Sequence, residues 1–251
     1  MTLYFIGLGL NDEKDISVKG LEAAKKCEVL YLEHYTSILA CSKDDLEKFY
    51  GKKIILAGRS MVEQDAETTI LKDAQKNNVG FLVVGDPFCA TTHLDLYMRA
   101  QQLNIPCEVI HNASVMSAIG MTGLQVYKFG KTTSIPFHNE NVESPYEVMK
   151  ANQAIGLHTL FLLDLDPLHN NYMTVHQAIG YLIKVSSKKG DKAFTESTVC
   201  IGCAQLGSQN QVIKAGPASD LLKAEFKHPP QCLIVPGTMH FMEEEVLALW
   251  K

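Results

Sequence analysis

Long apolar stretches are absent from this sequence of 251 residues. A membrane-spanning helix needs ~20 consecutive apolar residues, but the early run Leu3 to Leu10 contains two glycines and ends at Asn11 and Asp12. The N-terminus lacks the basic stretch that opens a secretory signal. Seven cysteines, an odd number spread widely, show no disulfide rhythm. We therefore predict an intracellular, cytoplasmic protein with reduced thiols and no membrane association.

Arginine is scarce, occurring only at Arg59 and Arg99, and the formal net charge is -5. No stretch combines basic and aromatic residues as a nucleic-acid groove would, so we expect no direct nucleic-acid ligand. With 46% hydrophobic and 20% charged residues, the composition is that of a globular protein rather than a disordered one.

Motifs for metal or phosphate chemistry are also missing. The nine histidines form no HExxH pattern, and the sequence has neither a P-loop nor a G-x-S-x-G elbow. The pair Cys200 and Cys203 has the CxxC spacing but no second pair, and in a strand the two thiols would point to opposite faces. We expect core packing for these cysteines and no bound metal.

The N-terminal half contains short apolar runs at regular intervals, whose starts are 26, 25, 27 and 26 residues apart. Continuous apolar runs are typical of strands buried on both faces, and this spacing leaves room for a helix in each crossover. We predict an N-terminal α/β domain with a mainly parallel sheet over residues 1–112. Its strands are expected at Leu3 to Gly7, Val29 to Leu32, Ile54 to Ala57, Phe81 to Val84 and Cys107 to Ile110.

The second half, residues 113–251, is less regular and predicts a second α/β domain with a mixed sheet. Thr174 and Gln177 have capping-box spacing and should begin a helix, as should Ser42 and Asp45 in the first half. Strands are expected at Thr159 to Leu163, Thr198 to Cys203 and Cys232 to Val235.

Three loops should meet at one edge of the first sheet, because they follow parallel strands. Gly7-Leu8-Gly9-Leu10 resembles the start of a dinucleotide fingerprint, but Asp12 stands where the third small residue belongs, which disfavours a Rossmann oxidoreductase. In the next loop, Asp86 would suit a cationic ligand, and Ser114 follows the fifth strand. The alternative for all three loops is that they form only tight turns and close packing. The pattern predicts a cleft for a small ligand without phosphate.

The residues of these loops resemble the diphthine synthases, methyltransferases of diphthamide biosynthesis with the tetrapyrrole methylase fold. The matching motifs are Leu3 to Asp12, Tyr31 to Ser37, Val84 to His93, Val109 to Ser114, Gly123 to Gly130, His158 to Leu160, Tyr172 to Thr174 and Val235 to Gly237. Each motif is modest, but together and in this order they cover nearly the whole chain.

The resemblance implies a homodimer whose two-domain chains bind S-adenosylmethionine in a cleft and release S-adenosylhomocysteine. The implied substrate is the modified histidine of translation elongation factor two, methylated on its amino group and, in eukaryotic members, on a carboxylate. The implied cofactor contacts are Leu10, Asp86, Cys89, Ser114, Val115, Leu165, Leu206 and Gln231. Members usually carry Gly at the position of Cys89 and His at that of Gln231, so these two should contact through the main chain. Gln205 replaces an Arg, and no catalytic base can be assigned.

Two other functions remain open at this point. A corrin or porphyrin methyltransferase would share the fold, because a fold does not fix the substrate. A non-catalytic module could bind S-adenosylmethionine and a partner without turnover.

Overall fold

The computed structural model describes residues 1–251, which separate into two compact units, Met1–Met116 and Ser117–Lys251. Each unit has its own sheet and its own apolar core. The boundary expected after residue 112 falls in the same connection, just before α6 (Val115–Ala118), which contains the division between the units. None of the helices has the length and apolar character needed to cross a bilayer.

The first unit contains a five-stranded sheet in the order β3-β2-β4-β1-β5, and every neighbouring pair is parallel. The strands are β1 (Leu3–Gly7), β2 (Val29–Glu33), β3 (Ile54–Ala57), β4 (Val79–Val83) and β5 (Cys107–Ile110). The predicted parallel sheet is thus confirmed, with β4 starting two residues earlier than expected.

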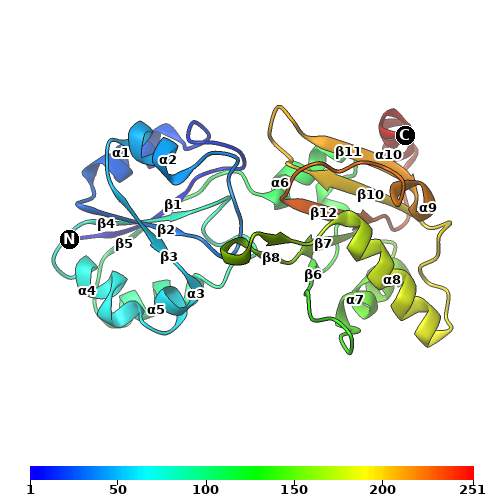
Figure 1. The fold of residues 1–251 in the computed structure, drawn as a ribbon, viewed down its shortest axis with the longest axis horizontal. Helices are drawn as coiled ribbons and strands as arrows, with labels where there is room; N and C mark the ends of the chain where they lie inside the picture. The colour runs from blue at the N-terminus through cyan, green and yellow to red at the C-terminus, as the bar shows by residue number, and fades with distance from the viewer. The chain divides into compact units, whose positions relative to one another are not determined.

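Helices cover both faces of this sheet (Figure 1). The helices are α1 (Val18–Lys26), α2 (Lys43–Tyr50), α3 (Arg59–Glu63), α4 (Ile70–Ala74) and α5 (Leu94–Gln102), with a 3-10 turn, η1, at Ala66–Thr68. Residues of α1 and α2 pack with one apolar cluster, and residues of α3, α4 and α5 pack with the other. The predicted capping box of α2 is present between Ser42 and Asp45.

Burial in the first sheet depends on strand position. All five residues of β4 are buried, as expected for a strand covered on both faces. In β3, however, Ile55 and Leu56 are each 43% exposed. The expectation of burial on both faces is wrong for β3, because this strand lies at the sheet edge, where the helices cover it incompletely.

The second unit contains a mixed sheet in the order β11-β10-β12-β7-β6, in which only β6 and β7 are parallel, so the predicted mixed sheet is confirmed. Its strands are β6 (Thr133–Ile135), β7 (Thr159–Leu163), β10 (Val199–Ala204), β11 (Val212–Pro217) and β12 (Gln231–Val235), and β8 (Leu165–Asp166) pairs with β9 (Asn171–Tyr172). The helices are α7 (Ser144–Ala154), α8 (Val175–Lys189), α9 (Ala218–Leu221) and α10 (Phe241–Leu247), with 3-10 turns η2 (Ile119–Thr122), η3 (Val126–Lys128), η4 (Pro167–His169) and η5 (Ala248–Trp250).

The side chains of this unit follow the predicted patterns. Thr174 and Gln177 form the capping box of α8, which buries its apolar stripe against the sheet. Cys200 and Cys203 are both fully buried in β10, and Cys203 lies directly opposite Cys232 of β12. Burial raises the pKa of Cys200 to about 12, and the hydrogen bond with Cys232 together with burial raises the pKa of Cys203. These thiols are core residues, as expected.

A buried carboxylate fastens α10 to the rest of the second unit. Glu243 is 1% exposed. Its Oε1 accepts hydrogen bonds from the Gln125 amide at 2.8 Å and from His158 Nε2 at 2.9 Å, and its Oε2 accepts from Lys128 Nζ and the His240 amide. Burial alone would raise the pKa of Glu243, but these hydrogen bonds lower it to about 2. The carboxylate is therefore charged in the folded protein.

We predict that Glu243→Gln lowers the free energy of unfolding by about 2–3 kcal/mol, because the partly buried ammonium of Lys128 and the other hydrogen-bond donors lose their anion. Since the folded pKa lies below the ordinary value, the stabilisation is fully present above about pH 5 and disappears as the pH falls towards about 2. Urea unfolding at several pH values, followed by the fluorescence of Trp250, measures this effect in the second unit. The control is Glu244→Gln, a change at an exposed neighbour; equal stability of the two variants would contradict the prediction.

Candidate active site

The topology of the first unit creates a crevice at the carboxyl ends of β1 and β4. These strands are hydrogen-bonded neighbours, but the chain leaves β1 towards α1 on one face of the sheet and leaves β4 towards α5 on the other (Figure 1). In open α/β sheets, ligands bind where neighbouring connections diverge in this way. A ligand is therefore expected at the exits of β1 and β4.

Two glycines hold these exits together. Gly9 and Gly85 form an antiparallel bridge, in which the Gly85 amide donates to Gly9 O at 2.7 Å and the Gly9 amide donates to Gly85 O at 3.3 Å. Their φ angles of +82° and +81° favour glycine. A Cβ on Gly7 would lie 2.7 Å from Gly85 O. The glycines thus have the structural role that we considered as the alternative, and that role brings two predicted ligand loops into contact.

Asp15 and Asn112 fix the first loop, and neither was singled out from the sequence. Asp15 Oδ2 accepts hydrogen bonds from the amides of Leu10 at 3.1 Å and Asn11 at 2.8 Å. Asn112 Nδ2 donates to Gly7 O at 2.9 Å and to Asp15 O at 3.0 Å. Asn112 lies within the matching motif Val109 to Ser114, which could have drawn attention to it. Asp15 lies outside the motif Leu3 to Asp12, so no such indication existed for it in the sequence. Leu10, a predicted cofactor residue, is positioned by both.

Asp86 lies at the centre of the second loop and is 5% exposed. Its Oδ1 accepts from the Phe88 amide at 3.0 Å, and its Oδ2 lies 2.7 Å from His111 Nδ1 and accepts from the Asn112 amide at 3.2 Å. Burial would raise the pKa of Asp86, but the hydrogen bonds outweigh it and lower the pKa. This carboxylate is charged and joins the exits of β4 and β5.

Two further predicted residues of the first unit, Ser114 and Cys89, lie near the second loop. A Cβ on Gly85 would lie 3.7 Å from Ser114 Cβ, so the exit of β5 runs beside the exit of β4. Cys89 is exposed, and its thiol lies near Ser114 and Asp86. Burial raises the pKa of Cys89, so the thiol is protonated at neutral pH. Val115, which begins α6, is half-buried.

The three predicted residues of the second unit lie at the same end of its sheet. Leu165 follows β7, Leu206 follows β10, and Gln231 begins β12, which is antiparallel to both of those strands. Gln231 Oε1 accepts from the Val175 amide at 2.9 Å, and its Nε2 donates to Phe226 O at 2.9 Å. Because both polar ends of this side chain are engaged, a ligand would meet the main chain of Gln231.

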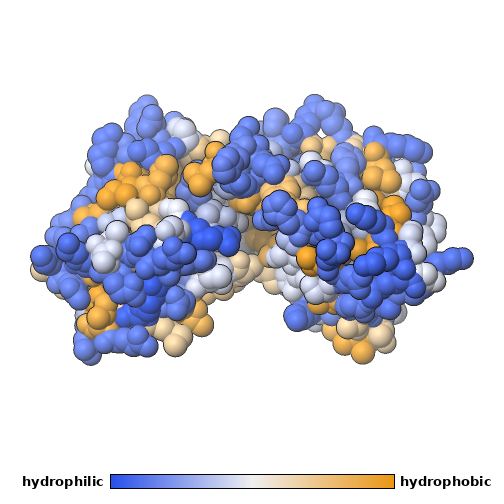
Figure 2. All heavy atoms as spheres, turned by 60° about the horizontal axis from the view of Figure 1, so that its bottom comes forward, coloured by the Kyte–Doolittle hydropathy of each residue, from blue (hydrophilic) through white to orange (hydrophobic).

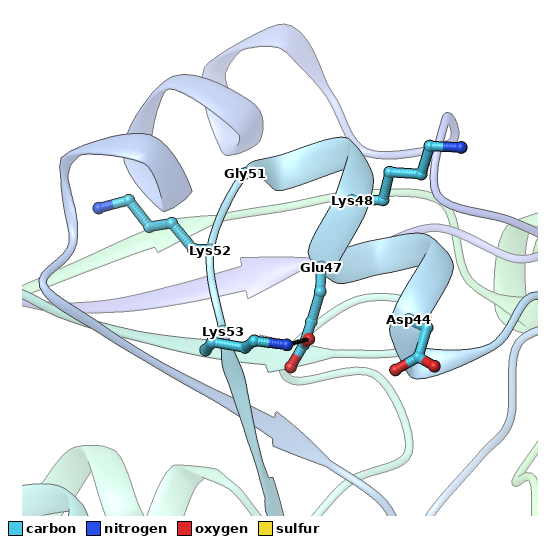
Figure 3. Close-up of a pocket in the computed structure, with 6 residues that line it drawn as sticks. All are labelled: Asp44, Glu47, Lys48, Gly51, Lys52 and Lys53. Atoms are coloured by element: carbon cyan, nitrogen blue, oxygen red, sulfur yellow. Dashed lines mark hydrogen bonds and ion pairs between the residues drawn. The ribbon is translucent and has the colours of Figure 1, made fainter.

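Two hollows of the first unit lie away from these residues. One, of about 430 Å³, is lined by residues around the end of α2, including Glu47, Lys48 and Lys53 (Figure 3). Glu47 there pairs with Lys53 at 2.6 Å. The other, of about 300 Å³, lies between α3 and α5, where Arg99 pairs with Glu67 and Asp95. Neither hollow includes a predicted cofactor residue.

The chemistry of the three loops fits S-adenosylmethionine. Residues 85–93 and 111–116 contain the charged Asp86 and no Lys or Arg. In the first loop, Lys14 is outnumbered by Asp12, Glu13 and Asp15. Loops in which acidic groups outnumber cationic side chains would repel a phosphate but suit a ligand that carries an ammonium and a sulfonium.

Comparisons with known proteins show the family of the chain. The model of the Tetrapyrrole (Corrin/Porphyrin) Methylases matches residues 2–222. The chain is 46% identical to the diphthine methyl ester synthase of Homo sapiens over 99% of this chain and 94% of that protein, and 46% identical to that of Dictyostelium discoideum over 98% and 96%. A crystal structure of diphthine synthase, 37% identical, superimposes with a TM-score of 0.92 over 100% of this chain and 96% of that one. The chain therefore belongs to the diphthine synthases, the methyltransferases of diphthamide biosynthesis within the tetrapyrrole methylase family.

Proposed function

We propose that the chain uses S-adenosylmethionine to methylate the modified histidine of translation elongation factor two, and that a methyl ester is among its products. The observation that supports this cofactor is the acidic character of the three loops at the exits of β1, β4 and β5, in which Lys14 is outnumbered by carboxylates. The ester is supported by the relatives, which are named diphthine methyl ester synthases. The substrate is a protein of the cytoplasm, and we propose that the chain acts there.

The loops bind and orient rather than exchange protons. When bound, S-adenosylmethionine supplies a methyl group whose bond to sulfur breaks, leaving its electron pair on sulfur, as the bond to the substrate oxygen or nitrogen forms. A carboxylate is already ionised at neutral pH, so esterification needs no general base. Leu10, Asp86 and Ser114 would fix the position of the cofactor, and alignment of this kind can contribute about 7–11 kcal/mol.

We predict that the protein, incubated with S-adenosylmethionine and elongation factor carrying the unmethylated modification, adds methyl groups to the peptide with the modified histidine. Intact-peptide mass spectrometry counts them, and mild base removes esters while leaving N-methyl groups in place. Elongation factor with an unmodified histidine is the control substrate.

Two results would contradict this function. Binding of S-adenosylmethionine without any methyl transfer would favour the non-catalytic module. Quenching of Trp250 by an added porphyrin or corrin, with methylation of that compound instead of the peptide, would favour a tetrapyrrole substrate.

We predict that Asp86→Asn weakens S-adenosylmethionine binding about 10- to 100-fold, because a charge-assisted contact and the junction of two loops are lost. The same change should lower the free energy of unfolding by about 1–3 kcal/mol, since the carboxylate accepts two backbone amides. Calorimetry well below the melting temperature separates the two effects. His111→Ala is the matched control, because it removes the exposed partner and leaves the carboxylate. If the Asp86→Asn variant is destabilised but binds S-adenosylmethionine with wild-type affinity, Asp86 only stabilises the turn and does not bind the cofactor.

We also propose a homodimer, supported by apolar side chains on the surface of the second unit. Met121, Val126 and Tyr127 are 52%, 44% and 81% exposed, and Phe241 and Met242 of α10 are 61% and 49% exposed. The two segments are joined through Gln125 and Glu243. On the face drawn in Figure 2, hydrophilic residues dominate and hydrophobic residues form small scattered groups.

We predict that light scattering gives about twice the chain mass of 27.8 kDa at micromolar concentration. Tyr127→Glu should shift the mass towards that of a monomer, because it places a charge among apolar side chains. Lys48→Glu, at an exposed position of the first unit, is the control. A wild-type mass of about 27.8 kDa would contradict the proposal.

A further inference from the structure

The two arginines of the chain have opposite environments. Arg99 is 17% exposed and is bound by Glu67, Asp95 and the carbonyl of Val62. Arg59 is exposed, and no carboxylate lies within ion-pair distance of it. Its guanidinium carbon lies 5.2 Å from the centre of the Tyr35 ring. Arg59 is thus held by an aromatic face while its hydrogen-bond donors remain available.

Arg59 lies at the same end of the sheet as the proposed cofactor loops, where the parallel strands have their carboxyl ends. It follows β3, and Tyr35 follows β2, in a sheet whose strands all leave at one edge. Neighbouring strands are about 4.8 Å apart, so the exit of β3 is roughly 10 Å from that of β4. A substrate side chain at the β4 exit can therefore come within reach of Arg59.

A column of rings connects Arg59 with the loop of Asp86. The Tyr35 ring packs edge-on against His93 at 6.1 Å, and His93 packs in the same way against Phe81 at 5.1 Å. His93 Nδ1 lies 3.1 Å from Pro87 O and donates to it, since a carbonyl only accepts. Burial lowers the pKa of His93 to about 4, so the ring is neutral. Arg59 is consequently placed on a rigid support that continues into the cofactor loop.

Two buried polar atoms in this column have no hydrogen-bond partner. They are the hydroxyl of Tyr35, which is 8% exposed, and Nε2 of His93, which is 0% exposed. Buried polar groups are nearly always paired, and exceptions often lie at functional sites. The Tyr35 ring, which carries one of these atoms, is also the ring over which the Arg59 guanidinium lies.

We propose that Arg59 binds a carboxylate of the protein substrate and holds it for transfer of the methyl group. This inference rests on the proposed function, because an ester requires a carboxylate nucleophile. A guanidinium binds a carboxylate through parallel hydrogen bonds, which leaves part of the carboxylate free to react. The neighbouring Glu33 does not compete: it is buried, and its oxygens accept from the Tyr35 amide, the Thr36 amide and the Thr36 hydroxyl.

The test compares Arg59→Gln and Arg59→Lys with the wild type. For elongation factor carrying the modification, we expect Arg59→Gln to weaken binding and raise KM about 10- to 100-fold, as expected for loss of a charge-assisted hydrogen bond. Arg59→Lys keeps the charge without the parallel donors, so its affinity and KM should lie between those of the wild type and those of Arg59→Gln. The affinity for S-adenosylhomocysteine should be unchanged and the melting temperature nearly so, because Arg59 is exposed, makes no hydrogen bond and contacts only the Tyr35 ring, a weak interaction at an exposed site.

Lys48→Gln is the matched control, since it removes one positive charge from an exposed side chain that points away from Glu47 at the end of α2 (Figure 3).

Elongation factor with an unmodified histidine distinguishes two sources of the carboxylate. A defect limited to the modified factor assigns the carboxylate to the modification, and an equal defect with both factors assigns it to an Asp or Glu of the partner. Wild-type binding of both factors by Arg59→Gln would overturn the proposal. Because binding needs no turnover, this comparison decides the role of Arg59 even if the wild type forms no ester, a result that would count against the proposed function.

Discussion

The first unit depends on the close approach of two strand exits, which backbone hydrogen bonds between Gly9 and Gly85 hold in contact. A side chain at either position would strain a backbone with positive φ, and a Cβ at Gly7 would collide with Gly85 O. Because the loops touch here, Asp86 reaches the exit of β5 and Asp15 reaches the backbone of Leu10. The ligand edge is therefore shaped mainly by backbone contacts.

Charge at this edge is distributed unequally. The exits of β1, β4 and β5 carry mainly acidic groups, whereas Arg59, which has no carboxylate partner, stands beyond the exit of β3. A cationic cofactor and an anionic substrate group are thus favoured at neighbouring positions of one edge. In the proposed esterification, the sulfonium and the carboxylate both lose their charge, so the products are attracted less strongly to either position than the reactants are. The same charges can serve binding and release.

The second unit solves a different problem, that of attaching a C-terminal helix. Glu243 gathers donors from Gln125, Lys128, His158 and His240, which are far apart in the sequence. His158 Nδ1 accepts from the Gly237 amide, which leaves its Nε2 hydrogen for Glu243. Both oxygens of this buried carboxylate accept two hydrogen bonds, which offsets the cost of a charge in a low-dielectric interior. Loss of the charge would release several segments together.

The sequence by itself determined the strands of the first sheet, the mixed character of the second and the caps of α2 and α8, because these follow from local periodicity and spacing. The motifs also carried the family. Only the tertiary structure decided that β3 is a half-exposed edge, that Asp86 bonds to His111 and Asn112, and that Arg59 rests on Tyr35. Strand order and the contacts between loops join residues distant in the chain, and no local pattern records which distant residues will meet.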